Sequence, residues 1–381
     1  MATFQLHHLR GGPRCNDGSL PGFYIREGSD VFLVWLEGGG HCGTKEECDQ
    51  RFAEDYRMSS SKLEAVRELD GIFSDSKLNP AFAHSTRVFI PYCSSDSWLG
   101  DRDEPVFGYY FQGRRIISAV MRQLAETFGL NSARLLVFGG CSAGGRGAFY
   151  NLDSVCSSLP NASTVCRGLL DAAWWVPDGG VLDASAKNGW QLWGEENPCT
   201  ATAPDPWRCL YGPTWAPHVR TPFLVHEEQF DHFLLGRLGI SSPAFSWSFA
   251  DWQEALRLRT ALRQSLSAAP SESSVVFSGA CRGHCLAESH GFWSVEVNSM
   301  SMERLTRQWL AGNESSVLET CMKPNCSKGC PFEPLLHELV LALATCLVLA
   351  LGVCLVFWRA GRAKVASCRW AVFRGHPTGP K

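Results

Sequence analysis

A glycine-rich stretch directly after an apolar run constrains the fold of this chain more than any other feature. Residues 139–147 read Gly-Gly-Cys-Ser-Ala-Gly-Gly-Arg-Gly and follow residues 135–138, an apolar run that predicts a buried strand. They contain a G-x-S-x-G pattern centred on Ser142. A sharp turn from strand to helix strains its tip residue, and flanking glycines remove the resulting clashes. The pattern predicts a serine hydroxyl exposed above a sheet; the alternative is a loop that only turns the chain.

Short apolar runs alternate with helical patterns on both sides of this stretch. The alternation indicates an α/β fold, with an α/β-hydrolase-like, largely parallel sheet and flanking helices. Runs with strand character occupy residues 23–25, 31–36, 87–90, 168–171, 221–225 and 274–277. Helical patterns occupy residues 61–69, 114–127 and 255–262. The first of these patterns offers Ser61 as an N-cap with Glu64 three residues later.

The chain contains 17 cysteines, more than an ordinary cytosolic enzyme uses. Fourteen of them lie between Cys15 and Cys330, an even number that indicates disulfide bonds formed in an oxidising compartment. The sequence does not determine their pairing. Zinc is the competing explanation, but the close cysteine pairs lack further ligands at finger-like spacing, so we predict no metal site. Glycosylation sequons at Asn161 and Asn313 also indicate an extracellular or luminal chain.

An uncharged run of twenty residues, 339–358, lies near the C-terminus. It is long enough to span a bilayer, and the six basic residues after it place a cytoplasmic tail at 359–381 by the positive-inside rule. A buried core helix and a GPI signal are the alternatives. We therefore expect an ectodomain at 1–320, a stalk rich in cysteine and proline at 321–338, and one transmembrane helix.

The first ten residues contain no apolar signal-peptide core, so we expect the natural N-terminus to lie upstream of this sequence. The net charge is −3, and the basic residues are scattered without forming a stripe. We therefore exclude nucleic acid as a partner. We also predict no cofactor.

A serine hydroxyl is a weak nucleophile unless a base takes its proton and a carboxylate orients that base. In α/β hydrolases the acid and then the histidine follow the serine along the chain. Asp231 and His284 fit this order, and each follows a predicted strand. Asp171 competes as the acid because it also ends a strand. The competing histidines are His218, His226, His232 and His290.

His284 is favoured as the base because it lies on a late loop between two cysteines that would hold it in place. Backbone amides that stabilise a developing oxyanion are predicted at two places. One is Ala143, whose N–H would point to the same spot as the serine hydroxyl. The other is the end of the strand at 31–36, where hydrolases of this architecture supply further amides; we predict Gly39 and Gly40 there, and a plain turn is the alternative.

Tryptophan is dense between residues 174 and 215, in a stretch interrupted by prolines. Such a segment between core elements often forms a lid over a binding site. The alternative is a satellite core held together by Cys199 and Cys209, and both descriptions can be true at once.

Several motifs in combination resemble the Notum and pectin acetylesterase family of serine carboxylesterases, over roughly residues 5 to 310. The matching stretches are residues 15–19, 36–39, 89–96, 142–145, 151–153 and 230–231. The resemblance implies Ser142 as nucleophile, Asp231 as its carboxylate and His284 as its base. It also implies an oxyanion hole formed by the backbone amides of Gly39, Gly40 and Ala143.

The resemblance implies an acylated extracellular protein as the substrate, because Notum enzymes remove palmitoleate from Wnt proteins and thereby suppress Wnt signalling. His41 stands where those enzymes have tyrosine, Trp175 where they have phenylalanine, and His232 where they have an acidic residue. We name these three as acyl-pocket residues and expect Trp175 to fill part of the space that Gly40 vacates.

Two other functions stay open. One is a glycan O-acetylesterase, because Cys141 and the pair His284-Cys285 are similar to the plant members of the family. The other is a non-catalytic extracellular binding module that keeps the fold, against which a complete triad argues. Selectivity for acyl length separates the two enzymatic hypotheses.

Overall fold

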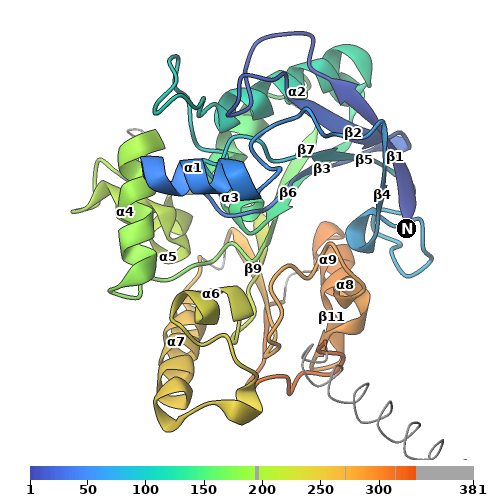
Figure 1. The fold of residues 1–381 in the computed structure, drawn as a ribbon. Helices are drawn as coiled ribbons and strands as arrows, with labels where there is room; N and C mark the ends of the chain where they lie inside the picture. The colour runs from blue at the N-terminus through green and yellow to red at the C-terminus, as the bar shows by residue number, and fades with distance from the viewer. Residues whose placement is uncertain (194–196, 271, 314, 332–381) are drawn as a thin grey trace, which may run out of the picture. The chain divides into compact units, whose positions relative to one another are not determined.

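Ten strands form one mixed sheet in the computed structural model, which describes residues 1–193, 197–270, 272–313 and 315–331 (Figure 1). Their order across the sheet is β12-β9-β8-β7-β6-β3-β5-β2-β1-β4. Neighbours from β5 to β12 are parallel, whereas β2, β1 and β4 add an antiparallel edge. The prediction of a largely parallel sheet with flanking helices is therefore confirmed.

The strands of this sheet are β1 Ala2–His8, β2 Gly22–Arg26, β3 Ser29–Leu36, β4 Val66–Leu69, β5 Ser85–Ile90, β6 Leu135–Cys141, β7 Val165–Asp171, β8 Phe223–His226, β9 Ser274–Ser278 and β12 Val317–Leu318. A separate small hairpin pairs β10 Glu296–Val297 with β11 Met300–Ser301. The α-helices are α1 Lys45–Glu54, α2 Gly113–Thr127, α3 Ala143–Ser157, α4 Val181–Trp193, α5 Gly212–Trp215, α6 His232–Arg237, α7 Phe249–Ser267, α8 Gly291–Ser294 and α9 Met302–Leu310. Short 3₁₀ helices are η1 Gly71–Phe73, η2 Leu130–Ser132, η3 Pro206–Leu210, η4 Ala216–His218 and η5 Ala244–Ser246.

Both faces of the sheet are buried, because successive side chains of a strand point to opposite sides. In β3, Val34 and Leu36 belong to one hydrophobic cluster and Trp35 belongs to the other. Helices α2, α3 and α7 cover the first face, and α8 and α9 cover the second. This double cover explains why the parallel strands read as continuous apolar runs.

The predicted helix at residues 61–69 is wrong. The last four of these residues form β4, which pairs with β1 from Ala2↔Leu69 to Gln5↔Val66. No strand was predicted near the N-terminus, yet β1 presents an open edge there, and pairing with that edge outweighs the weak local preference for helix. Every strand expected from an apolar run is present, with at least one bound shifted by one to three residues.

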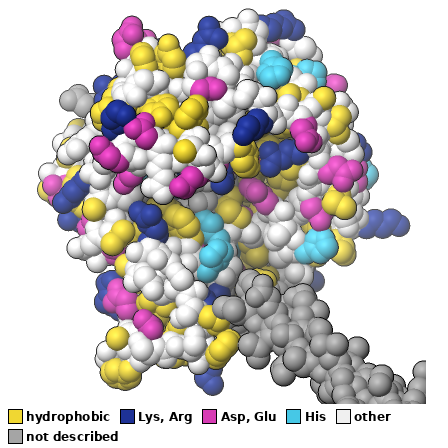
Figure 2. Space-filling model, in the orientation of Figure 1, with side chains coloured by type: hydrophobic (Ala, Val, Ile, Leu, Met, Phe, Trp, Pro, Cys, Tyr) yellow, Lys and Arg dark blue, Asp and Glu magenta, His cyan; other side chains and the backbone are white. Residues whose placement is uncertain are grey.

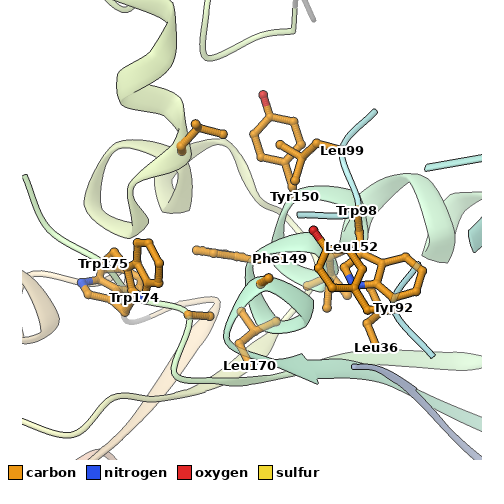
Figure 3. Packing of buried hydrophobic residues seen from close by; sticks show 14 of the residues in the cluster. Leu36, Tyr92, Trp98, Leu99, Phe149, Tyr150, Leu152, Leu170, Trp174 and Trp175 are labelled. Carbon is orange, nitrogen blue, oxygen red and sulfur yellow. The ribbon is translucent and has the colours of Figure 1, made fainter. Parts of the chain in front are cut away.

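The tryptophan-rich segment packs as core and also forms one wall of the cavity described below. Trp174 is fully buried, stacks on Phe149 of α3 and donates its Nε1–H to Ser265 Oγ at 2.8 Å. Figure 3 shows Trp174 and Trp175 beside Phe149, with Tyr92 and Trp98 on the other side of α3. A disulfide joins Cys199 to Cys209. The satellite core is therefore present, and α4 within it reaches the cavity.

All fourteen cysteines from Cys15 to Cys330 are paired. The seven disulfides are Cys15–Cys93, Cys42–Cys48, Cys141–Cys285, Cys156–Cys166, Cys199–Cys209, Cys281–Cys330 and Cys321–Cys326. They agree with an extracellular or luminal location of this unit. Residues 321–331, whose composition indicated a stalk, carry three of these cysteines and belong to the same compact unit, Met1–Pro331.

The membrane span expected at 339–358 and the tail expected at 359–381 lie outside the described residues. Within the described part of the chain, every helix is too short or too polar to cross a bilayer.

Candidate active site

Ser142 lies at the tip of the turn between β6 and α3. Its backbone adopts φ +57° and ψ −121°, a conformation that costs energy for any residue other than glycine. The adjacent glycines make the turn feasible: a Cβ on Gly144 would lie 2.0 Å from the carbonyl oxygen of Leu36, and one on Gly140 would lie 2.5 Å from Gly144 itself. The serine N–H donates to the carbonyl of Asp171 at 2.8 Å. These contacts fix the bend that presents the hydroxyl.

Asp231 and His284 are joined by a hydrogen bond of 2.5 Å between Oδ2 and Nδ1. Asp231 caps α6, and its Oδ1 accepts a hydrogen bond from the amide of Phe233 at 2.7 Å. This bond holds the carboxylate in place independently of the imidazole. The Phe233 ring stacks on that of His284 at 5.1 Å. Burial lowers the pKa of His284, but the charge and the hydrogen bond of Asp231 outweigh it, and the net shift is upward from 6.5.

His284 also lies next to the turn that carries Ser142. The disulfide Cys141–Cys285 joins the residue before the serine to the residue after the histidine. A ring nitrogen of His284 lies within 4.8 Å of both sulfur atoms. Its Nε2 is buried and has no hydrogen-bond partner among the described residues. This nitrogen is thus left available for a proton, and bonds from base to nucleophile are often long in resting enzymes.

The loop after β3 closes over the serine from the other side. A Cβ on Gly38 would lie 3.0 Å from the Cβ of Ser142, so the two segments are in contact. Gly39 and Gly40 have φ of +140° and +71°. Both residues line the cavity that Ser142 also lines. Ala143 is the first residue of α3, where the amide lacks an intrahelical acceptor and the helix dipole is positive. Gly39 and Gly40 therefore line the same cavity as Ser142, and Ala143 directly follows Ser142 at the start of α3.

A cavity of about 510 Å³ opens at Ser142 and His284. Trp175, Leu182 and Phe233 form an apolar wall, and the Trp175 and Phe233 rings lie 5.6 Å apart. Charged side chains line the rest: Glu37, Arg51, Asp55, Arg57, Arg237 and Glu288. Figure 2 shows basic and histidine side chains beside hydrophobic ones in the region between α1 and α6 of Figure 1. The lining of the cavity thus combines apolar and charged side chains.

Two of the three predicted acyl-pocket residues line this cavity. His41 is held by a 2.9 Å hydrogen bond to Ser185 of α4. Burial lowers the pKa of His41 to about 3, with Arg146, Arg51 and Arg237 adding to the effect, so the ring is neutral. Trp175 lines the cavity as well, with the guanidinium of Arg146 4.5 Å from its ring centre. His232 is exposed, contacts the carbonyl of Arg282 and does not line the cavity.

The competing candidates lie elsewhere. Asp171 and His226 bond to each other at 2.6 Å in the core. His290 contacts Asp70 on the surface, and His218 lies in 3₁₀ helix η4. Of the two sequons, Asn313 is exposed and Asn161 is half-buried, its Oδ1 accepting the Ser163 amide at 2.9 Å.

Sequence reasoning missed one buried residue beside the pair. Glu227 is fully buried, accepts the amide of Trp174 at 2.8 Å and faces Asp231. Burial raises the pKa of Glu227 well above 4.5, and the negative charge of Asp231 raises it further. Its only signal in the sequence was an acidic pair directly after a strand. The cationic lining of the cavity was missed as well, because its arginines come from separate elements.

Comparison with known proteins shows the family of this chain. The family model described as Pectinacetylesterase matches residues 3–331. The chain belongs to the pectinacetylesterase family. It is a carboxylesterase of that family and a serine hydrolase.

Within the pectinacetylesterase family, the chain is similar to enzymes named palmitoleoyl-protein carboxylesterases. It is 30% identical to notum2 of Xenopus laevis over 364 residues, covering 86% of this chain and 74% of the relative. It is 32% identical to NOTUM of Drosophila melanogaster over 317 residues, covering 77% of this chain and 46% of that protein. A crystal structure of the Wnt deacylase Notum from Drosophila superposes with a TM-score of 0.78 at 30% identity, covering 87% of this chain and all of that chain.

Proposed function

We propose that this member of the pectinacetylesterase family hydrolyses an ester-linked acyl group on an extracellular substrate, with Ser142, His284 and Asp231 as its catalytic triad. The observation that carries the proposal is the 2.5 Å bond between Asp231 and His284 at the cavity that the strained Ser142 also lines. A buried carboxylate, an imidazole with a free nitrogen and a serine on a tight turn form the set that acyl transfer requires.

In this mechanism Ser142 Oγ attacks the ester carbonyl while His284 Nε2 takes the hydroxyl proton. The amides of Gly39, Gly40 and Ala143 hold the developing oxyanion. The tetrahedral intermediate collapses, the C–O bond to the alcohol breaks, and His284 returns the proton to the leaving oxygen. Water, deprotonated by the same imidazole, then attacks the acyl-serine, which releases the carboxylic acid and restores Ser142. Asp231 keeps the His284 tautomer and offsets the positive charge on the ring.

For the substrate, we propose an acylated protein, with palmitoleoylated Wnt as the leading case and reduced Wnt signalling as the consequence. The names of the similar proteins support this choice. So does the apolar wall of Trp175, Leu182 and Phe233 in a cavity of about 510 Å³, a volume within the range that encloses small-molecule ligands.

A second candidate is O-acetyl ester hydrolysis on glycans, which the charged side chains that line the cavity favour. Arg51, Arg57 and Arg237 line it together with Glu37 and Glu288. A long alkyl chain bound against these groups would displace their water without replacing the lost hydrogen bonds, which costs free energy. The hydroxyl groups of a sugar would replace those hydrogen bonds.

A series of esters of increasing acyl length, from acetyl to palmitoleoyl on a serine-containing peptide, separates the two substrates. The purified protein should hydrolyse medium and long chains at a higher kcat/KM than acetyl. A strict preference for acetyl would remove the lipid substrate and leave the glycan ester. Ser142→Ala should abolish turnover in both cases, whereas Ser154→Ala, an exposed position on the same helix, should not change it.

The binding-module hypothesis has its own test in cells. If Ser142→Ala reproduced every effect of the wild-type protein on signalling, binding rather than hydrolysis would be the better account. Anchoring through residues 339–358 is a further part of our proposal. We expect the protein to partition with membranes and its Met1–Pro331 unit to be accessible to protease from outside the cell.

A further inference from the structure

A second Asp–His pair lies in the core beside the loop that carries His284. Asp171 ends β7 and His226 ends β8, and the two residues are direct neighbours in the register of these strands. His226 Nδ1 lies 2.6 Å from Asp171 Oδ1, and both side chains are fully buried. Neither residue lines the cavity at Ser142. This pair therefore has no access to substrate, and its role must be exerted through other residues.

Glu228 completes the group. Its Oε1 lies 3.4 Å from His226 Nε2, an ion-pair distance without the geometry of a good hydrogen bond, and its side chain is also fully buried. A neutral imidazole would turn a lone pair toward one of the two carboxylates, whereas an imidazolium faces both with N–H groups. Burial lowers the pKa of His226, but Asp171 and Glu228 outweigh it and raise the pKa to about 10. His226 is thus a buried cation between two acids.

Each of the two acids holds one end of the His284 loop. Glu228 Oε2 accepts the amide of Cys281 at 2.9 Å, and Asp171 Oδ2 accepts the amide of Ala287 at 2.7 Å. His284 lies between these two anchors. The backbone carbonyl of Asp171 also accepts the amide of Ser142 at 2.8 Å. One residue therefore contacts both the turn that presents the nucleophile and the loop that presents the base.

We propose that Asp171, His226 and Glu228 form a positioning cluster in which the buried imidazolium holds the two carboxylates that set His284 against Ser142. None of the three is a catalytic residue, because none touches the reacting atoms. The inference rests on the proposed triad, and it holds for any acyl group that the enzyme removes.

The cluster also acts on the base through its charge. Titratable groups that interact with His226 include Asp171, Glu227, Glu228 and His284, and Glu288 interacts with Asp171. Among the influences on the pKa of His284, the charge of Asp171 raises it and the charge of His226 lowers it. Removing the cation at residue 226 should therefore make His284 easier to protonate, and a purely structural defect would not have this effect.

The test is His226→Gln in the full-length protein, with p-nitrophenyl acetate as the substrate. Two facing carboxylates without a cation repel each other and release the loop, so kcat should fall on the order of 10²-fold, as a misplacement of about 1 Å would cause. KM should change little. The acid limb of the kcat/KM profile should move to higher pH. His226→Gln/Glu228→Gln removes one of the repelling charges and should recover a large part of kcat.

Arg87→Gln is the matched control, because Arg87 is equally buried and pairs with Asp75 far along the chain from the site. It should lower stability without moving the acid limb. The proposal is overturned if His226→Gln keeps wild-type kcat. It is also overturned if His226→Gln loses kcat while the acid limb of its kcat/KM profile stays at the wild-type pH and the double variant recovers no kcat. That pattern would indicate a structural defect. The rate of the wild-type protein on the same ester tests the proposed function separately. A failure of the proposed function is therefore distinguishable from a failure of the positioning cluster.

Discussion

At the residue scale, the protonation state of His284 decides when the proposed site can work. The ring must be neutral to take the proton of Ser142. Since its pKa is raised above 6.5, mainly because the effect of Asp231 exceeds that of burial, the imidazole is protonated and inactive at mildly acidic pH. We therefore expect kcat/KM to rise with pH through a midpoint above 6.5.

Asp231→Asn tests this origin of the pH dependence. An amide keeps the shape but removes the charge, so the midpoint should fall toward acidic pH. At the same time kcat should fall about 10³- to 10⁴-fold, because the His284 tautomer is no longer imposed. A pH–rate profile of the variant measures both quantities. An unmoved midpoint would show that another group controls the profile.

Glu227 gives a second prediction, on stability. Its folded-state pKa lies above 4.5, so the folded protein keeps a proton that the unfolded chain releases once the pH exceeds that value. Stability from this group is therefore lost as pH rises from 4.5 toward the folded-state pKa. Glu227→Gln is neutral at every pH and should be more stable than wild type at pH 8, with the difference vanishing near pH 4.5. Thermal unfolding at both pH values measures this.

Glu227→Ala is the contrasting variant, because it leaves the Trp174 amide without its acceptor. It should be less stable than wild type by about 1–3 kcal/mol near pH 4.5. The difference should shrink toward pH 8, because only the wild type loses stability from this carboxyl group as the pH rises. If Glu227→Gln gained no stability relative to wild type at pH 8, Glu227 would be ionised in the folded protein.

Sequence patterns predicted the residues that belong to local motifs, and they missed those defined by contacts. Ser142 lies in a fixed glycine pattern, and Asp231 and His284 each follow a strand, so their order along the chain was informative. Asp171 and His226 had the same strand-end signal but are partners of each other. Only the pairing of β7 with β8 reveals this, and spacing along the chain does not encode it.

At the element scale, the disulfide Cys141–Cys285 joins the strand of the nucleophile to the loop of the base. It closes a loop with a sequence separation of 144, whereas Cys199–Cys209 closes one of 10. In the chain-entropy view, their removal costs about 5 and about 3 kcal/mol, respectively. The two disulfides therefore contribute similar amounts to the free energy of unfolding. They differ in position, because Cys141–Cys285 joins two segments of the site and Cys199–Cys209 does not.

Cys141→Ser/Cys285→Ser should lower kcat at least about tenfold at a temperature where the variant is still folded. Cys199→Ser/Cys209→Ser, the matched control, should lose stability while keeping kcat. Both measurements use the same ester assay, with circular dichroism to confirm folding. Equal kcat in the two double variants would show that the first bond only stabilises the fold.

Elements with strong apolar runs were predictable, and elements that depend on distant partners were not. The parallel strands β3, β6, β8 and β9 are buried on both faces and therefore stand out as apolar runs. The strand β4 alternates between exposed and half-buried residues and exists because β1 pairs with it. The capping pattern of Ser61 and Glu64, which precedes β4, is typical of a helix, and no local feature contradicted it.

At the scale of the whole molecule, the cysteine-rich segment after residue 320 completes the catalytic unit. Cys330 pairs with Cys281, and Ser327 Oγ accepts the Ala280 amide at 3.0 Å. Asn325 Oδ1 accepts the amide of Arg282 at 2.8 Å. These contacts clamp the backbone directly before His284. Composition alone made the segment resemble a spacer.

A chain ending at residue 331 should therefore be secreted and active when supplied with a heterologous signal peptide. A chain ending at residue 320 should retain a free thiol at Cys281 and lose activity. Secretion yield, thiol titration and ester hydrolysis measure the difference. Full activity of the shorter chain would show that the segment is a spacer after all.

The central claim is that Ser142 is a nucleophile activated by His284. A fluorophosphonate probe, which labels only activated serines, tests it most directly when applied to wild type, Ser142→Ala and His284→Ala. We predict rapid labelling of wild type, with a rate that rises with pH through the His284 midpoint, and no labelling of either variant. Labelling of Ser142→Ala at the wild-type rate, or no labelling of the folded wild-type protein, would contradict the account.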